Sequence, residues 1–387
     1  MKKQQIISMA LILTMTLLTL VGCSSKVSTD KNIDREVPVV GNLKFDYSMD
    51  IKYAENFSVD YFEGGYALIS ISNDTRFLVV PENMEVPEGM EEDIAIIQQP
   101  VSNIYLVATA AMTFFDKLDA LNAIRLSGTK AEGWAIENVV KEMEAGNILF
   151  SGKYSEPDYE LIMAEDCKLS IQSSMITHAP EIKEKLEELG LTVLVEQSSY
   201  EPHPLGRTEW IKVYSVILDK EELGEEIFNK QAKILDELKD IENTGKTVAF
   251  FYVGSSGSIS ARNSHDYVPK MIEMAGGKYI FENLGDPNKA TSTTKMGMEE
   301  FYSTAKDADY IIYNSTITGG MNSLEELLDK NELFSNFKAV KEGNVWCTGQ
   351  NFYQNSSEFG TIIKEIRTIL IEDDEKFSDL KHFYKLK

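Results

Sequence analysis

Strand-like and helix-like segments alternate along most of this chain, and that alternation constrains its fold more than any other feature. A strand pattern at 104–108 precedes a helix pattern at 110–121, and the same order recurs, with a helix pattern at 131–144, as far as a strand pattern at 191–195. The segment 207–218 then looks helical. A second block starts with a buried strand pattern at 247–253, includes a helix pattern at 333–340 and finishes with a helix pattern at 357–372. Strands joined by helices form βαβ units, so the sequence predicts two α/β lobes with largely parallel central sheets.

One long helix is expected between the two blocks. Residues 221–241 are rich in Glu, Lys, Leu and Ala, carry a loose apolar stripe, and are followed by Asn243-Thr-Gly. Ahead of the first block, the patterns at 57–62 and 66–72 flank Gly64-Gly65, which is typical of a strand hairpin. The sequence therefore predicts an α/β fold whose lobes are joined by a single long helix and preceded by a small N-terminal strand-rich extension.

The first residues have the pattern of an export signal. Lys2 and Lys3 form a charged start, and the apolar run 6–20 is too short and too one-sided for a stable membrane span. The run ends in Leu20-Val21-Gly22-Cys23, which resembles the bacterial lipoprotein box, where the cysteine is acylated and becomes the mature N-terminus. An ordinary signal peptide is the alternative, although an Ala-x-Ala site would then be expected. The resemblance implies several acyl chains, such as palmitate, because one chain alone binds a membrane only marginally.

We expect the lipid on Cys23 to hold the protein at the extracellular face of a cell membrane of the Gram-positive type. The residues after it are polar and without apolar periodicity, as in a flexible tether. The predicted organisation is 1–22 lipoprotein signal peptide, 23–40 flexible tether, 41–100 strand-rich extension, 101–218 first α/β lobe, 219–242 connecting helix and 243–387 second α/β lobe.

Charge and cysteine content exclude several classes of function. A formal net charge of −24 is unsuited to non-specific nucleic-acid binding, and its plain interpretation is solubility. Cys167 and Cys347 are too far apart for a disulfide framework or metal cluster, and we expect both to be buried as small apolar residues. No HxH, HExxH or CxxC spacing occurs, so neither a zinc site nor another cofactor is expected. The histidines are His178, His203, His265 and His382.

Candidate ligand contacts gather in Gly/Ser-rich segments after the predicted strands. In open α/β sheets, ligands bind beyond the carboxyl ends of the strands, where helix N-termini offer free N–H groups to carboxylates or phosphates. The segment Gly254-Ser-Ser-Gly-Ser is neither a Walker loop nor GxGxxG, and we interpret it as a flexible cleft loop that carries Arg262 toward an anion. Aromatic side chains nearby could stack on a planar or macrocyclic ligand. The candidate ligand-binding residues are Tyr154, Ser174, Met175, Tyr200, Arg207, Ser255, Ser256, Arg262, Tyr267, Asn314 and Tyr353.

Each candidate also has a plainer interpretation. Any one loop can be ordinary turn or capping structure, an arginine can be a surface charge, and an aromatic residue can belong to the core. The coincidence of many such segments favours a binding site. No GxSxG elbow occurs, and the pairs Glu187-Glu188 and Glu299-Glu300 fit solvated helix faces better than acid–base pairs. The sequence therefore indicates binding rather than catalysis.

Three segments resemble the substrate-binding lipoproteins of ABC importers for iron–siderophores, haem and cobalamin, above all their Gram-positive versions. They are Asp158-Tyr-Glu-Leu-Ile, Met175-Ile-Thr-His-Ala-Pro-Glu-Ile-Lys-Glu-Lys-Leu-Glu-Glu-Leu-Gly190 and Ser198-Ser-Tyr-Glu-Pro-His-Pro-Leu-Gly-Arg-Thr-Glu-Trp-Ile211. The resemblance covers about residues 100–370 and is weaker in the second lobe. It implies two lobes joined by one rigid helix, which matches the long helix predicted above. Opening of such a protein should be small.

The resemblance also implies partners. In that family each lobe presents a surface glutamate to arginines of the permease, and Glu181 matches that position in the first lobe. In the second lobe Glu299 or Glu300 falls near the equivalent helix start. The plainer explanation for Glu181 is a carboxylate that favours a helix N-terminus. Family ligand contacts differ: siderophore binders often use arginines, for which Arg207 and Arg262 are the counterparts, while some haem binders use tyrosine or histidine and cobalamin binders use aromatic residues.

The leading hypothesis is a monomeric binding protein that captures a metal chelate or tetrapyrrole and delivers it to an ABC permease. A ferric siderophore is the first expectation, with cobalamin and haem as alternatives. A different hypothesis is an enzyme on the same fold, such as a chelatase or metallocluster oxidoreductase. That enzyme would need several cysteine or histidine ligands, which the sequence hardly offers. A third is an interaction lipoprotein without a small ligand.

Overall fold

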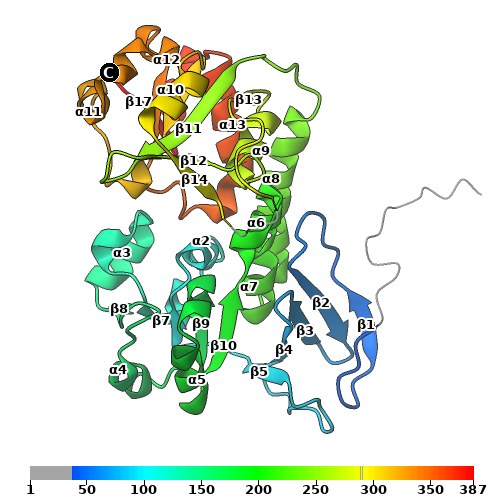
Figure 1. Ribbon diagram of the computed structural model, residues 1–387. Coiled ribbons are helices and arrows are strands. Elements are labelled where there is room, and N and C mark those ends of the chain that lie inside the picture. Colours follow the sequence, from blue (N-terminus) through cyan, green and yellow to red (C-terminus); the bar gives the residue numbers. More distant parts are fainter. Residues whose placement is uncertain (1–36, 288, 290) are drawn as a thin grey trace, which may run out of the picture. The chain divides into compact units, whose positions relative to one another are not determined.

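The computed structural model describes residues 37–287, 289 and 291–387 (Figure 1). The predicted signal peptide, Cys23 and the tether as far as residue 36 lie outside the described residues. Residues 39–387 form one unit by their contacts. Among the described residues, no helix combines the length and the apolar character needed to span a membrane.

A five-stranded sheet forms the strand-rich extension, as predicted. Its order is β1-β2-β3-β4-β5, antiparallel except for the parallel pair β4 and β5. The hairpin turn has φ values of 92° and 83° at Gly64 and Gly65, a region that favours glycine. The edge strands β1 and β5 were not predicted. The strands are β1 Phe45–Ser48, β2 Phe57–Phe62, β3 Tyr66–Ile71, β4 Thr75–Val80 and β5 Ile94–Gln98.

A wholly parallel sheet forms the first lobe, with the order β10-β9-β6-β7-β8. Its strands are β6 Ile104–Leu106, β7 Ile124–Ser127, β8 Leu149–Phe150, β9 Leu169–Ser173 and β10 Thr192–Glu196. The crossover helices are α2 Thr109–Lys117, α3 Glu137–Glu144, α4 Tyr159–Ala164 and α5 Pro180–Glu188. The helix predicted over 131–144 begins only at Glu137, because Trp134 and Ile136 turn into the core in extended conformation.

Three helices follow the sheet of the first lobe: α6 Pro204–Glu209, α7 Ile211–Ile217 and α8 Glu221–Leu238. The prediction of one helix over 207–218 is wrong, because the segment divides at Trp210 and starts earlier, with Pro204 at the first helical position. The long helix is confirmed as α8, although it ends at Leu238. It packs against α7 and against α13 Phe359–Leu370.

The second lobe has a mixed sheet with the order β14-β12-β11-β15-β16-β17, and β13 also pairs with β11. The strands β13, β11, β15 and β16 are parallel, whereas β12 and β17 run antiparallel to their neighbours. The strands are β11 Thr247–Val253, β12 Ile259–Arg262, β13 Lys278–Tyr279, β14 Thr293–Met296, β15 Tyr310–Tyr313, β16 Val345–Thr348 and β17 Phe383–Lys385. The remaining helices are α9 Tyr267–Met274, α10 Met298–Ala305, α11 Leu324–Lys330 and α12 Lys338–Lys341.

Two predictions for the second lobe are wrong. Arg262 lies on a strand rather than a flexible loop, because Gly254 N–H donates to the Ser258 carbonyl (2.8 Å) and closes a hairpin between β11 and β12. The helix predicted over 333–340 is a 3-10 turn followed by the short α12. The chain is extended at Phe337 (φ −69°, ψ 140°), which with Phe334 is completely buried.

The N-terminal sheet shares its core with the first lobe. Val59 and Ile69 of the sheet belong to the same cluster of buried side chains as Trp210 and Phe228 of the helices. The second lobe has its own cluster, built around β11, β15 and α13. Both predicted apolar cysteines, Cys167 and Cys347, are buried and unbridged, as expected. The extension is therefore part of the first lobe's packing.

Candidate functional site

A cavity of about 340 Å³ lies between residues of both lobes, beyond the carboxyl ends of β9 and β10. The first lobe contributes the turns after these strands and one residue of α6, and the second lobe contributes the start of α9 and the segment before β14. This is the place where open α/β sheets bind ligands. The lining residues are Ser174, Ser199, Tyr200, Glu201, Pro202, Arg207, His265, Asp266, Tyr267, Lys289, Thr291 and Ser292.

Among the described residues, two cationic side chains line the cavity, the exposed Lys289 and the half-buried Arg207. The guanidinium carbon of Arg207 lies 3.6 Å from the centre of the Tyr267 ring, and one terminal nitrogen donates to the carbonyl of Ser199. Its Nε is buried and has no hydrogen-bond partner in the described part of the chain. A buried donor without a partner is costly, so a ligand acceptor at this nitrogen would stabilise the site.

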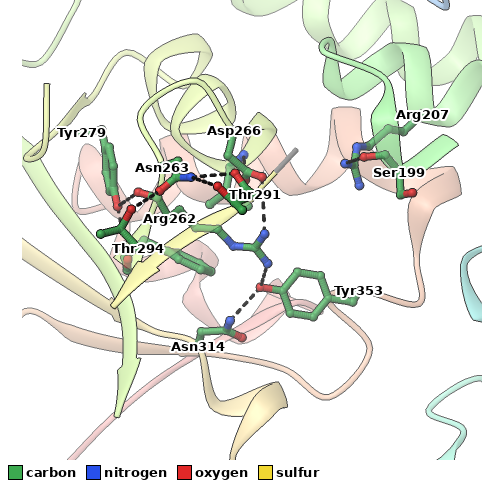
Figure 2. Close-up of polar contacts among 12 residues, drawn as sticks. Ser199, Arg207, Arg262, Asn263, Asp266, Tyr279, Thr291, Thr294, Asn314 and Tyr353 are labelled. Carbon is green, nitrogen blue, oxygen red and sulfur yellow. Dashed lines mark hydrogen bonds and ion pairs between the residues drawn. The ribbon is translucent and has the colours of Figure 1, made fainter. Parts of the chain in front are cut away.

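Arg262 is held in a polar group with Asp266, Asn314 and Tyr353 (Figure 2). One terminal nitrogen donates to the hydroxyl of Tyr353, and the other lies 3.4 Å from a carboxylate oxygen of Asp266. Asn314 also donates to the Tyr353 hydroxyl, at 2.7 Å. The Nε of Arg262 and the Oδ1 of Asn314 are buried without a partner among the residues described. The group thus offers one further donor and one further acceptor.

The protonation states follow from burial and from these neighbours. Burial raises the pKa of Tyr267 and of Tyr353, although the neighbouring guanidiniums act in the opposite direction. Burial lowers the pKa of Arg262, but Tyr353 and Asp266 outweigh it, and the pKa lies above its ordinary value. Both tyrosines are therefore neutral at physiological pH, and Arg262 is a cation.

The structure brings seven of the candidate residues together. Ser174, Tyr200, Arg207 and Tyr267 line the cavity. Arg262, Asn314 and Tyr353 form the adjoining polar group, and the guanidinium carbon of Arg262 lies 5.8 Å from the centre of the Tyr267 ring.

Four candidates lie outside the cavity lining. Tyr154 is half-buried and packs against a core cluster of the first lobe. Ser255 and Ser256 are exposed at the tip of the hairpin between β11 and β12. Met175 is exposed beside the lining residue Ser174.

Sequence reasoning missed several lining residues. Asp266 carried a usable signal, because it caps α9 by accepting a hydrogen bond from Val268 N–H (3.1 Å), as aspartate before a helix often does. Two exposed apolar side chains were also missed, Phe150 at the end of β8 and Ile317 after β15. Phe150 ends its parallel strand, and Ile317, like Met175 and Tyr200, follows the carboxyl end of one, where an aromatic or apolar ligand surface would be bound.

The candidate docking glutamates are exposed in the first turns of two helices. Glu181 lies in the first turn of α5, and Glu299 and Glu300 lie in the first turn of α10. Because β14 and β11 are both antiparallel to β12, α10 starts from the carboxyl edge of its sheet, as α5 does after β9. Each lobe thus has an exposed carboxylate at the edge that carries the candidate ligand loops.

The sequence model of the periplasmic binding protein family matches residues 107–351. The chain belongs to this family. This binding protein therefore has a solute-binding role, in a family whose members work outside the cytoplasm, and the resemblance noted in its sequence is confirmed. The family and the solved structures that it resembles are those of binding proteins rather than enzymes.

Two relatives of this binding protein are uncharacterized lipoproteins of Methanocaldococcus jannaschii. One is 24% identical over 415 residues, which cover 98% of this chain and 96% of the relative. The other is 27% identical over 353 residues, with 87% of each chain covered. The first alignment leaves too little of the chain uncovered to omit the N-terminal sheet, so this extension is not an isolated addition.

Solved structures show the same fold. The petrobactin-binding protein YclQ of Bacillus subtilis has a TM-score of 0.58 at 15% identity, covering 79% of this chain and 98% of YclQ. The periplasmic haem-binding protein HutB of Vibrio cholerae has a TM-score of 0.57 at 14% identity, covering 70% of this chain and 98% of HutB. The predicted class, α/β lobes with parallel sheets and a strand-rich extension, is confirmed.

Proposed function

We propose that this binding protein captures an anionic metal chelate, a ferric siderophore in the first place, and delivers it to an ABC permease. The observation that carries the proposal is the pair of arginines beside Tyr267, each with a buried Nε that has no partner in the described structure. One of them lines a cavity shared by both lobes. Guanidinium groups match the paired oxygens of carboxylates and catecholates, and they remain charged.

The surroundings of the arginines fit a ligand with aromatic or apolar parts. Tyr200 is 52% exposed in the cavity wall, and Phe150, Met175 and Ile317 are exposed at or after the ends of other strands. A binding protein that leaves such side chains exposed at its ligand edge gains affinity when a ligand covers them. The siderophore and haem ligands in the names of the compared structures agree with this chemistry.

Haem is the second candidate ligand. Tyr200 and His265 both line the cavity, and both residue types serve as axial ligands of haem iron. The arginines would then meet the haem propionates. Cobalamin carries less negative charge than a ferric siderophore or haem, so it would make the fewest contacts with the arginines.

We also propose the location and the partners that the sequence suggests. A lipid on Cys23 anchors the protein, as a monomer, at the outer face of the cell membrane, and the relatives named as lipoproteins support this. Glu181 in one lobe and Glu299 or Glu300 in the other meet the permease. The division into 41–100, 101–218, 219–242 and 243–387 remains our proposal for the mature domains.

A panel of ligands tests the function. Thermal unfolding is measured with ferric catecholate and hydroxamate siderophores, haem and cobalamin, each at about one hundred times a trial Kd, where binding adds about 2.7 kcal/mol of stability. We expect a ferric siderophore to raise the Tm and to be recovered unchanged. The shift should be much smaller for Arg207→Ala than for Arg76→Gln, which removes a guanidinium that is paired with Asp93 and does not line the cavity. The proposal is contradicted if no ligand of the panel raises the Tm, or if a ligand is recovered chemically altered.

A further inference from the structure

Two buried carboxylates beside the cavity hold a segment of the N-terminal extension. Glu209 of α6 accepts hydrogen bonds from the backbone N–H groups of Lys52 (2.9 Å), Tyr53 (2.7 Å) and Ala54 (2.9 Å). Glu201 continues the series. It accepts from the N–H groups of residues 55 (2.8 Å) and 56 (3.0 Å), and also from the indole of Trp210 (2.8 Å). Residues 52–56 thus present consecutive N–H groups to the two glutamates, and we call this arrangement the carboxylate clamp.

The clamp is too buried to be an incidental surface contact. Glu201 is 2% exposed and Glu209 is fully buried. Burial raises the pKa of Glu201, although its hydrogen bonds act in the opposite direction. A buried carboxylate is stable only when its oxygens are hydrogen-bonded, and bonds to a charged group are about twice as strong as neutral ones. Residues 52–56 lie between β1 and β2, outside any ladder, so the glutamates satisfy N–H groups that the sheet leaves open.

A glycine lets the clamped segment touch the helix itself. A Cβ at Gly206 would lie 3.1 Å from the carbonyl oxygen of Tyr53 and 3.3 Å from the Cα of Ala54. Both distances are tighter than ordinary contact, so the segment packs on α6 at the position just before Arg207. The clamp and this contact together fix the helix from the side of the extension.

The clamp also reaches the cavity. Glu201 is itself a lining residue and follows Tyr200, while Arg207 lies on α6 between Gly206 and the second clamp residue. We propose that residues 52–56 act as a positioning element of the ligand site, holding Arg207 and the turn of Tyr200 in place through Glu201 and Glu209. This inference rests on the proposed function, in which Arg207 meets the anion. It makes the N-terminal extension a determinant of affinity.

Three variants test the clamp, and one control matches them. Glu201→Gln and Glu209→Gln each replace an accepting oxygen by an amide that repels an N–H group. Gly206→Ala leaves both glutamates in the chain and adds a methyl group that crowds the segment and, at 3.2 Å, Oε2 of Glu201. Glu365→Gln is the control. Glu365 is a buried helix carboxylate of the second lobe that accepts from the N–H groups of Lys381 and His382, both at 3.0 Å.

The first readout needs no ligand. Phenylglyoxal modifies exposed guanidinium groups, and mass spectrometry follows its addition to Arg207 at a temperature where circular dichroism shows every variant folded. We expect the rate at Arg207 to rise severalfold in the three clamp variants and to stay unchanged in Glu365→Gln. Equal rates in all four variants would overturn the inference.

The second readout is affinity for a defined probe, the iron(III) complex of 2,3-dihydroxybenzoate, measured by quenching of tryptophan fluorescence. If displacement of the Arg207 guanidinium costs about 1.4 kcal/mol of binding free energy, the Kd rises about tenfold. We expect a loss of affinity of this size in the clamp variants only. Clamp variants that bind as tightly as Glu365→Gln would contradict the inference. If the wild-type protein ignores the probe, anion capture fails for catecholates, and the Arg207 modification rates alone decide the clamp.

Discussion

The guanidinium of Arg207 stacks on the ring of Tyr267, with 3.6 Å between the guanidinium carbon and the ring centre. Arg207 lies on α6, which follows the first-lobe sheet, and Tyr267 begins α9 of the second lobe. The contact therefore joins the two lobes at the cavity. A ligand that binds the open Nε of Arg207 would meet both lobes through this one pair.

Replacing Arg207 should weaken ligand binding. A hydrogen bond to a charged group contributes about 1.5–3 kcal/mol, so Arg207→Ala should raise the Kd between about tenfold and a hundredfold. Arg207→Lys should recover only part of the affinity, because an ammonium group neither stacks flat on Tyr267 nor binds two oxygens at once. Isothermal titration with the ligand that the panel identifies measures the effect. A Kd unchanged in Arg207→Ala would remove Arg207 from the site.

The stability of the protein should be greatest at mildly acidic pH, because of a buried histidine. His382 is fully buried, with Nε2 3.4 Å from Glu358 and Nδ1 3.1 Å from Glu365. Burial lowers the pKa of His382, but the two carboxylates outweigh burial and raise it above 6.5. The contribution of protonated His382 to the free energy of unfolding is fully present below pH 6.5 and is lost as the pH rises through the folded-state pKa.

Glu358 limits stability on the acid side. His382, and then Lys117 of the first lobe at 2.8 Å, lower the pKa of Glu358 from 4.5 to about 2. Its contribution, a few kcal/mol, is present above pH 4.5 and is lost as the pH falls toward 2. Urea unfolding should therefore show a maximum between pH 4.5 and 6.5. His382→Gln should abolish the decline above pH 6.5, whereas His178→Gln, at an exposed position, should not. A decline that persists in His382→Gln would refute this assignment.

The anchor prediction concerns Cys23, outside the described residues. Cys23→Ala should lose acylation and membrane retention and still bind ligand as the wild type does, because the ligand site lies in the folded lobes. Membrane fractionation and mass spectrometry of the mature N-terminus provide the measurement. A Cys23→Ala protein that is processed and yet stays on the membrane would show that another feature anchors it.

The docking glutamates should affect transport and leave binding unchanged. Glu181→Lys should reduce ligand-stimulated ATP hydrolysis by the reconstituted permease, because it reverses a charge at the proposed contact. Glu299→Lys and Glu300→Lys, tested separately, should show which of the two matters. Glu188→Lys, at the far end of the same helix as Glu181, is the matched control. Loss of stimulation in the control as well would indicate a general effect of net charge.

The fold was predictable because its elements are periodic. The alternation of strands and helices, the glycine hairpin and the length of α8 are local signals, and the structure bears them out. Short elements were not predictable in the same way. β12 has four residues, too few for an alternating pattern to stand out, so the sequence pattern around Arg262 predicts a loop. The 3-10 turn before α12 likewise depends on where Phe334 and Phe337 pack.

The site was only partly predictable, because its main relationships join distant parts of the chain. Serines and arginines after strands could be recognised locally, and Ser174 and Arg207 do line the cavity. The partners of Glu201 and Glu209 lie about 150 residues away, and nothing local distinguishes a buried glutamate from a solvated one. Ser255 looked equally suitable and lies at an exposed hairpin tip.

The central claim is that the cavity between Arg207 and Tyr267 carries an anionic metal chelate. The most direct test is the absorption spectrum and mass of the small molecule that co-purifies with the protein from its native host, compared with the Arg207→Ala variant. The account predicts an intact, negatively charged metal chelate on the wild-type protein and much less of it on the variant. A wild-type protein that carries no small molecule when its host is starved of iron, or equal occupancy in both proteins, would contradict it.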